Sequence, residues 1–198
     1  MKKPISVLYR TLVTLIFFAM VAPLNAHSTN DAIFTRTEAM IPMRDGVRLH
    51  TRVYTPTRAT ERVPILLLRT PYGIGDLSAA QLAAALQELT ADGYNIVQQD
   101  IRGRFKSEGQ FVMLRQPRDP IDKSAIDEST DTFDTIDWLL KNTPNNNGRV
   151  GIAGTSYGTW LAVMGMLDPH PALKAVVQHA SPASVTIFIT VMVSNTHT

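Results

Sequence analysis

The sequence of 198 residues contains no cysteine. Disulfide bonds and a lipid anchor on a cysteine are therefore excluded, and the fold depends on its hydrophobic core for stability. There is also no uninterrupted apolar run of the ~20 residues that a bilayer-spanning helix needs. Internal repeats and low-complexity tracts are absent as well, which argues against repeat architectures.

The longest apolar run lies near the start of the chain. Three basic residues occur among the first ten, an apolar segment follows at 11–22, and residues 23–26 form a cleavage region of the secretory type. We expect residues 1–26 to be a signal peptide and the mature protein to begin at His27. This predicts a secreted or periplasmic protein without stable membrane insertion after cleavage. An uncleaved membrane anchor is the alternative.

The residues after this segment carry nearly equal numbers of basic and acidic side chains. The segment holds three of the 19 basic residues and none of the 17 acidic ones, so residues 27–198 carry 16 basic against 17 acidic side chains. A chain so nearly balanced gives no indication of a nucleic-acid partner. Its length is that of one domain.

Strand-like apolar runs alternate with helix-like amphipathic segments along the rest of the chain. A turn at 44–46 between two alternating segments predicts a hairpin over 40–54. Strands separated by helices form mostly parallel sheets with helices on both faces, so we expect an α/β fold. The pattern predicts further strands at 63–69, 94–101, 149–153 and 175–179, and helices at 78–91, at 127–142 and after residue 156. The faces expected to be buried are Leu82, Leu86 and Leu89 in the first helix, Phe133, Ile136, Leu139 and Leu140 in the second, and Trp160, Leu161, Met164 and Leu167 in the third.

Between the strand at 149–153 and the last helix lies the sequence Gly154-Thr155-Ser156-Tyr157-Gly158. A serine becomes a useful nucleophile when it is held clear of its neighbours and beside a base, and a tight strand-to-helix turn achieves the first condition. The two glycines remove Cβ atoms that would clash in such a turn. The Tyr157 N–H, at the start of the helix, is a natural donor to an oxyanion. We interpret Ser156 as the nucleophile; the alternative is a glycine-rich turn without chemistry.

Four separate stretches, in this order, resemble one family, the X-Pro dipeptidyl-peptidase-like α/β-hydrolases. That family includes the cocaine esterase type (CocE/NonD) hydrolases, the α-amino-acid ester hydrolases and the glutaryl-cephalosporin acylases. The resemblance runs from Arg44 to Pro182 and implies an α/β-hydrolase fold. The stretches are Arg69-Thr70-Pro71-Tyr72-Gly73; Asp100-Ile101-Arg102-Gly103 with Ser107-Glu108-Gly109; Asp134 to Leu139; and Gly148-Arg149-Val150-Gly151 leading into residues 154–158.

The resemblance implies roles for individual residues. Ser156 matches the nucleophile that forms the acyl-enzyme, Tyr157 supplies its backbone N–H, and Tyr72 matches a second oxyanion donor through its phenol. Without the other motifs, Tyr72 could equally be an aromatic residue that closes a Pro-Tyr-Gly turn. Neither a metal nor an organic cofactor is implied, and the expected substrates are small esters, amides or peptides.

Charged residues at the predicted strand ends are expected to support the site rather than to react. All parallel strands end at one edge of the sheet, where sites collect, and Tyr72, Asp100, Arg102 and Ser156 should all lie there. We expect Asp100 and Arg102 to form an ion pair or a loop brace at the floor of the site. Glu108 is expected to be a solvated loop charge.

The sequence after Ser156 is poor in the two other residues that a serine hydrolase of this fold requires, an acid and then a histidine. The acid present is Asp168, at the far end of the helix that follows Ser156. His179 should lie on the catalytic edge, without a carboxylate to orient it. His170 belongs to a helix-ending loop, and His197 is next to the terminus.

The family pattern stops after Pro182. We expect an α/β-hydrolase domain over 27–198 that is incomplete at its C-terminus, with residues 183–198 foreign to the fold and the strand ending at His179 left with an open, aggregation-prone edge. The alternative is that Val185–Val193 is a true strand of a shortened domain. Oligomerisation is left open.

The function expected from these observations is acyl transfer to Ser156, with hydrolysis of esters or amides. α-Amino-acid esters and β-lactam side-chain amides are favoured over X-Pro dipeptides. The competing hypothesis is a catalytically inert fragment or a binding-only module, because the acid and histidine are missing. A nucleotide-binding domain is disfavoured, since Thr70 to Gly75 lacks the spacing of a phosphate-binding loop.

Overall fold

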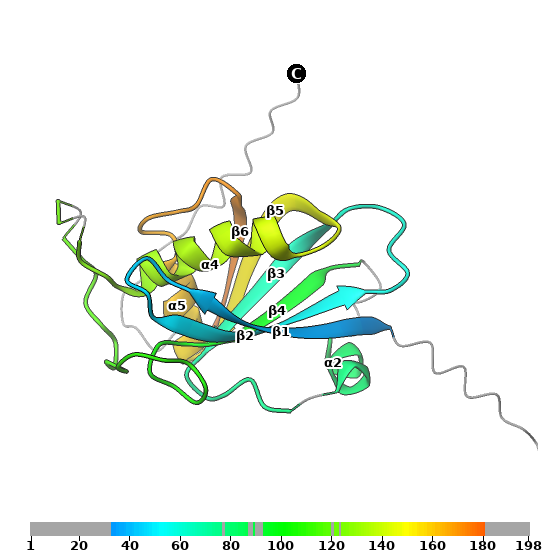
Figure 1. Cartoon of the computed structure of the whole chain (residues 1–198), viewed down its shortest axis with the longest axis horizontal. Coiled ribbons are helices and arrows are strands. Elements are labelled where there is room, and N and C mark those ends of the chain that lie inside the picture. Colours follow the sequence, from blue (N-terminus) through cyan, green and yellow to red (C-terminus); the bar gives the residue numbers. More distant parts are fainter. Residues whose placement is uncertain are drawn as a thin grey trace, which may run out of the picture. The chain divides into compact units, whose positions relative to one another are not determined.

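The computed structural model describes residues 33–180, except 77, 87, 88, 90–92, 120 and 123 (Figure 1). The predicted signal peptide at 1–26 and the segment 183–198 lie outside the described residues. In the part of the chain that is described, no helix combines the length and the apolar character needed to cross a membrane.

The predicted hairpin is confirmed and is longer than expected. Strand β1, Phe34–Pro42, pairs antiparallel with β2, Arg48–Pro56, over its whole length. The turn between them is closed by a bond from the Met43 N–H to the Val47 carbonyl at 2.8 Å. Gly46 has a φ of 85° in this turn, which a residue with a side chain adopts only with strain.

Six strands form one sheet in the order β1-β2-β4-β3-β5-β6 (Figure 1). β2 joins β4 in antiparallel fashion, and the pairs β4–β3, β3–β5 and β5–β6 are parallel. The mostly parallel sheet is therefore confirmed, and the C-terminal ends of its parallel strands share one edge. The bounds of these strands are Val63–Thr70 for β3, Asn95–Asp100 for β4, Asn146–Thr155 for β5 and Leu173–His179 for β6.

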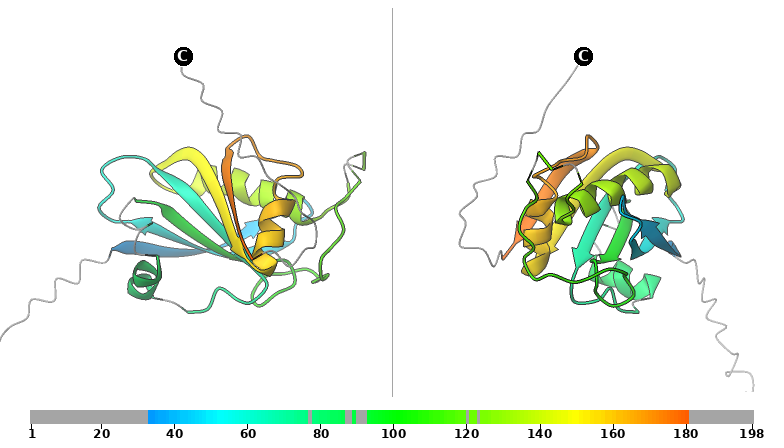
Figure 2. Two further views of the ribbon diagram at one scale, coloured as in Figure 1. Left: turned by 180° about the vertical axis from the view of Figure 1, so that it is seen from behind. Right: turned by 60° about the vertical axis from the view of Figure 1, so that its left-hand side comes forward.

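Helices cover both faces of the sheet. Helices α4, Glu128–Asn142, and α5, Tyr157–Met164, pack on one face, and α2, Ala79–Ala85, packs on the other (Figure 2). Each fully buried leucine or isoleucine contributes about 1.5–3 kcal/mol to such a core. The α4 and α5 side is filled by residues that include Ile65, Leu67, Val97, Ile136, Leu139 and Ile152, and the α2 side by Phe34, Tyr54, Leu82 and Ile96.

Helix α2 is shorter than the pattern predicts. Ser78 caps it, with its side chain accepting from the Gln81 N–H, and Leu86 ends it. Leu82 is buried as expected, and Leu86 is half-buried against the same cluster. The remainder of the predicted helix falls largely on residues outside the described ones.

Helix α5 also ends early, so that one predicted core residue is wrong. Leu161 and Met164 are buried as predicted and Trp160 is half-buried, but Leu167 lies beyond the helix and is 55% exposed. The helix stops at Gly165, where a Cβ atom would lie 2.9 Å from the Thr132 side chain on α4. The absence of a side chain at Gly165 therefore allows α5 and α4 to approach closely.

Helix α4 is confirmed, with a burial pattern that differs from the prediction. Asp127 caps it by accepting bonds from the N–H groups of Ser129 and Thr130. Ile136 and Leu139 are buried, whereas Phe133 and Leu140 are only half-buried. The first turns instead bury polar side chains, from Glu128 to Thr132. Arg69 on β3 reaches Glu128 and Thr132, and Arg102, just after β4, reaches Asp131.

Candidate active site

Ser156 lies in a sharp turn between β5 and α5. Its φ of 56° and ψ of −121° represent a conformation that costs a non-glycine residue about 1–3 kcal/mol and persists where its surroundings impose it. Here the Ser156 N–H donates to the His179 carbonyl at 3.0 Å, and the Ser156 carbonyl accepts from the Thr159 N–H at 2.9 Å. The predicted strand-to-helix turn is present, and it leaves Ser156 exposed.

The two glycines of this turn are not equally necessary. A Cβ atom on Gly154 would lie 2.0 Å from the Gly158 carbonyl oxygen, so no side chain fits there. A Cβ atom on Gly158 would lie 3.4 Å from the Arg69 carbonyl oxygen, which a small local shift accommodates. The steric argument from the sequence is thus correct for Gly154 and overstated for Gly158.

Tyr72 and Tyr157 both lie beside Ser156. The phenol oxygen of Tyr72, in the loop after β3, is 3.5 Å from the Ser156 Oγ. This distance is long for a hydrogen bond, and it leaves both hydroxyls facing a shared space. Tyr157 is the first residue of α5, so its backbone N–H has no carbonyl one turn earlier in the helix to accept from it.

An open pocket of about 500 Å³ lies at this edge of the sheet. It extends along the ends of β3, β5 and β6 and is mostly apolar where it is not backbone. Its wall includes Leu68, Tyr72, Ala153, Ser156, Val177 and His179. The pocket gives a carbonyl substrate direct access to the Ser156 side chain.

Asp168 and His170, which follow Ser156 in the chain, bind other partners and do not pair with each other. Asp168 binds Arg118 through a 2.8 Å ion pair. The His170 ring lies 4.7 Å from the Phe133 ring and accepts from the Ala172 N–H at 3.0 Å, and burial lowers its pKa. Both residues belong to the loop after α5, in agreement with the prediction that this loop is not a catalytic dyad.

His179 ends β6 on the expected edge and lines the pocket. The His179 backbone contacts the serine turn, because its carbonyl accepts hydrogen bonds from both the Ser156 N–H and the Thr159 hydroxyl. Within the described ranges, no carboxylate lies close enough to its ring for an ion pair. This agrees with its interpretation as a polar residue at a strand end.

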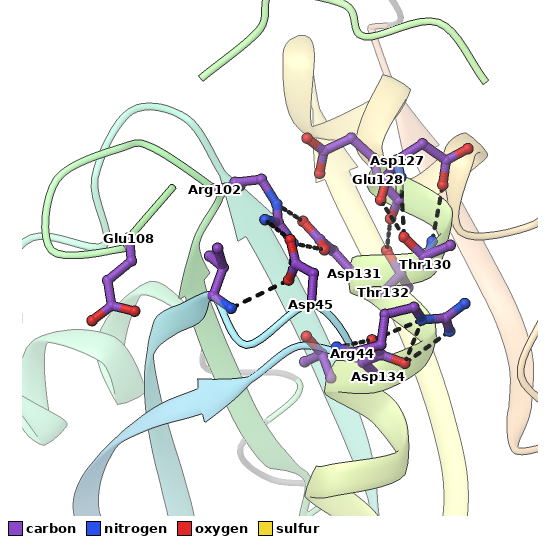
Figure 3. Close-up of polar contacts among 12 residues, drawn as sticks. Arg44, Asp45, Arg102, Glu108, Asp127, Glu128, Thr130, Asp131, Thr132 and Asp134 are labelled. Carbon is purple, nitrogen blue, oxygen red and sulfur yellow. Dashed lines mark hydrogen bonds and ion pairs between the residues drawn. The ribbon is translucent and has the colours of Figure 1, made fainter. Parts of the chain in front are cut away.

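Asp100 and Arg102 lie at the predicted edge but do not pair with each other. Asp100 binds the His50 ring at 2.9 Å. The Arg102 guanidinium lies between Asp131, at 2.7 Å, and Asp45, at 2.6 Å (Figure 3). Burial alone would lower the pKa of Arg102, but its bonds to the two carboxylates raise it. Both residues therefore act as braces, which is one of the two expected roles. Asp100 binds a side chain on β2, and Arg102 binds one on α4.

Glu108 is a loop charge with a side chain 39% exposed, as the sequence suggested, but it also has a partner. Its carboxylate accepts from the Arg48 backbone N–H and from the Arg48 Nε, both at 3.0 Å. These bonds lower the pKa of Glu108 and fasten the loop after β4 to the start of β2. The sequence did not predict this ion pair, because Arg48 lies 60 positions earlier in the chain.

A buried ion cluster behind the site was missed from the sequence. The Arg69 guanidinium donates to the Glu128 carboxylate at 3.0 Å and to the Thr132 hydroxyl at 2.6 Å. Arg69 and Glu128 are almost fully buried, and burial raises the pKa of Glu128 although Arg69 opposes that effect. The cluster joins β3 to the start of α4. Its one signal in the sequence was an arginine at the end of an otherwise apolar strand.

The described residues offer no group of three histidine, aspartate or glutamate side chains that could hold a metal ion. The geometry presents an exposed serine hydroxyl beside the Tyr72 phenol and the Tyr157 backbone N–H.

An exposed serine in a strained turn, at the C-terminal edge of a mostly parallel sheet, is characteristic of the α/β-hydrolases. The chain belongs to the X-Pro dipeptidyl-peptidase (S15) family, whose model matches residues 45–189. The resemblance seen in the four sequence stretches is thereby confirmed.

Individual relatives agree with this assignment. The chain is 39% identical over 122 residues to a cocaine esterase of Rhodococcus sp. (strain MB1 Bresler), a match that covers 61% of the chain. A crystal structure of an aminopeptidase from a Thaumarchaeota archaeon superposes with a TM-score of 0.68 and 43% identity over 75% of the chain. An α-amino acid ester hydrolase superposes with a TM-score of 0.67 and 40% identity over 78% of the chain.

The chain spans a small part of each of these proteins. The matched region is 19% of the cocaine esterase, 26% of the aminopeptidase and 28% of the α-amino acid ester hydrolase. The likeness therefore concerns the part of the family's domain that carries the serine turn.

Proposed function

We propose that the protein is a secreted or periplasmic serine hydrolase that acts through a seryl acyl-enzyme. The Ser156 Oγ attacks the carbonyl carbon of an ester or amide, and its proton passes through a general base to the leaving alcohol or amine as the carbonyl–leaving group bond breaks. Water then attacks the acyl-enzyme, releases the acid and restores the seryl O–H. In this proposal the base and the acid that orients it come from outside the described residues.

The proposal rests on one observation, the proximity of the Ser156 Oγ to the Tyr72 phenol oxygen. The backbone strain at Ser156 has no evident structural use other than to expose its hydroxyl. The Tyr72 phenol oxygen, 3.5 Å away, supports the proposal that this phenol and the Tyr157 N–H hold a developing oxyanion. Loss of one such donor typically lowers the rate about 100- to 1000-fold.

Among substrates, we propose α-amino-acid esters and β-lactam side-chain amides ahead of X-Pro dipeptides. In support, one relative of 40% identity is named an α-amino acid ester hydrolase and one of 43% identity an aminopeptidase. Hydrolysis rates with phenylglycine methyl ester, cephalexin and Ala-Pro-p-nitroanilide would order the three classes. A preference for the last would contradict this part of the proposal.

The test of the proposal is labelling with a fluorophosphonate probe, which reacts with a base-activated serine. The wild-type protein should be labelled, and Ser156→Ala should abolish the label. Ser124→Ala is the matched control, because Ser124 lies exposed in the loop before α4 and its hydroxyl donates to Asp122, far in sequence from the serine turn. Labelling that survives Ser156→Ala would refute the assignment of the nucleophile.

A second candidate is a binding-only module or an inert domain. It is favoured by the engagement of Asp168 with Arg118 and by the absence, within the described residues, of a carboxylate beside His179. A protein that is folded by circular dichroism yet unlabelled by the probe would support this candidate. Binding of a non-hydrolysable substrate analogue would then separate a binding module from an inert domain.

Export is tested separately, by Edman sequencing of protein recovered from the periplasm or medium. The proposal requires an N-terminus at His27. An N-terminus at Met1 in that fraction would contradict cleavage of residues 1–26.

A further inference from the structure

Three side chains from three strands form a hydrogen-bonded chain in which His50 and Asp100 are buried and Glu38 is partly exposed. The His50 Nδ1, on β2, lies 2.9 Å from the Asp100 Oδ2 on β4, and the His50 Nε2 lies 3.2 Å from the Glu38 Oε2 on β1. The side chain of His50 is 5% exposed and that of Asp100 is 2% exposed. Buried ionisable groups this close are costly unless their hydrogen bonds are satisfied.

The chain continues from Asp100 into the loop that carries Tyr72. The second carboxylate oxygen of Asp100 accepts from the Ile74 backbone N–H at 2.9 Å. The hydroxyl of Ser107 fixes the same region, because it accepts from the His50 N–H at 2.8 Å and donates to the Asp100 carbonyl at 2.6 Å. The orientation of Asp100 therefore sets the position of the backbone two residues after Tyr72.

Both ring nitrogens of His50 face carboxylate oxygens. Against two ionised carboxylates, each contact is a hydrogen bond only if that ring nitrogen carries a proton, so the doubly protonated ring satisfies both. The Glu38 carboxylate is ionised, because its hydrogen bond with His50, followed by that with Arg52, lowers its pKa to about 2. Arg36, at 4.0 Å from Glu38, adds a further positive charge on β1.

We propose that His50 is a positioning residue: it binds Glu38 and Asp100 with both ring N–H groups and, through Asp100, holds the Tyr72 phenol opposite Ser156. The role in positioning rests on the proposed function, whereas the state of the ring does not. The ring state and the oxyanion donor can therefore be tested independently.

The ring state is measured by ¹⁵N NMR of the full chain at neutral pH. The chain has five histidines, and the His50 signals are assigned by their loss in His50→Gln. We expect both His50 ring nitrogens to have protonated shifts and slowly exchanging protons. A single-tautomer neutral pattern would overturn the double-donor arrangement whether or not the protein is an enzyme.

The positioning role is measured by a double-mutant cycle on the rate of fluorophosphonate labelling. His50→Gln should slow labelling about tenfold, since small displacements of a catalytic group have large effects on rate. In a Tyr72→Phe background, His50→Gln should change the labelling rate less than about twofold, because the hydroxyl that His50 is proposed to position has already been removed. Equal effects in both backgrounds would show that His50 acts through general stability and would overturn the proposal.

His170→Gln is the matched control, as His170 is another partly buried histidine, and it contacts Phe133 rather than the Tyr72 loop. It should leave labelling unchanged. If the wild-type protein is not labelled at all, the proposed function fails, and hydrogen exchange at the Ile74 amide replaces the rate as readout. That amide should exchange about tenfold faster in His50→Gln, since its acceptor loses its fixed orientation; unchanged exchange would overturn the positioning role.

Discussion

The phenol oxygen of Tyr157 accepts a 2.8 Å hydrogen bond from the backbone N–H of Leu114. Tyr157 follows Ser156 directly, whereas Leu114 belongs to the long loop between β4 and α4, so this bond ties the loop to the serine turn. The Tyr157 ring also packs between Phe111 and Trp160, with centroid distances of 6.3 and 5.2 Å. Burial raises the pKa of the phenol, which keeps it un-ionised well into the alkaline range.

Tyr157→Phe removes this bond and retains the ring. We expect the free energy of unfolding to fall by about 1 kcal/mol, the usual net value of one hydrogen bond. Hydrogen exchange at the Leu114 amide should accelerate, as measured by mass spectrometry on peptides from the loop. Tyr94→Phe, in the half-buried position before β4, is the control. Unchanged exchange at Leu114 would show that other contacts hold the loop.

Alanine at the two glycines of the serine turn should have very different effects. Gly154→Ala places a Cβ atom 2.0 Å from the Gly158 carbonyl oxygen, and we expect a loss of about 3 kcal/mol or more, or failure to fold. Gly158→Ala meets the Arg69 carbonyl oxygen at 3.4 Å and should cost less than about 1 kcal/mol. Thermal unfolding of the two variants gives the comparison. Similar melting temperatures would contradict this geometry of the turn.

Removal of the Arg69 guanidinium should be strongly destabilising. Arg69→Met leaves the buried Glu128 carboxylate without its partner, which typically costs about 3–5 kcal/mol. The double variant Arg69→Met/Glu128→Leu should recover part of that loss, because the uncompensated charge is gone. Urea unfolding measures both.

The control for this cluster is Lys141→Met, which breaks the exposed pair between Lys141 and Asp137 on the same helix. Its effect should not exceed about 0.5 kcal/mol. If Arg69→Met and Lys141→Met had equal effects, the buried cluster would not stabilise the protein.

Glu38 should make stability depend on pH in the acid range. Its pKa is about 2 in the folded protein against an ordinary value of 4.5. Because the folded-state value is the lower one, the contribution of Glu38 is complete above pH 4.5 and is lost as the pH falls toward 2. The side chain is 38% exposed, so solvent reduces the effect.

Urea midpoints of the wild type and of Glu38→Gln test this dependence. The difference between them should be constant near neutral pH and shrink steadily in the acid range. Glu61→Gln, at an exposed position before β3, should show no such convergence. A difference for Glu38→Gln that persists to pH 2 would contradict the lowered pKa.

Much of this fold could be predicted because its signals are local. The turn at Gly46, the apolar run of β3 and the serine turn at Ser156 each depend on neighbours within a few residues. Parallel topology then places Tyr72 and Ser156 at one edge without further information. The two side chains lie close together in the structure, as predicted. Their catalytic roles remain predictions.

What could not be predicted depends on partners that are distant in sequence. His50 sits in a strand where nothing local marks it, and its partner Asp100 lies 50 positions later. Polar burial in the first turns of α4 requires Arg69, 59 positions before Glu128. Periodicity reports which face is apolar, and it carries no information on such long-range pairs.

The strand order has a consequence for the kinetics of folding. β3 lies between β4 and β5, and Val63 pairs with Asn146 far along the chain. Contacts that close such long loops form slowly, because the entropy of loop closure is lost before the contacts form. During synthesis from the N-terminus, the hairpin of β1 and β2 can form early, while one side of β3 stays unpaired until β5 has been made. The nascent chain therefore exposes the apolar centre of its sheet throughout the synthesis of the segment between β3 and β5, a period in which chaperone binding would be most effective.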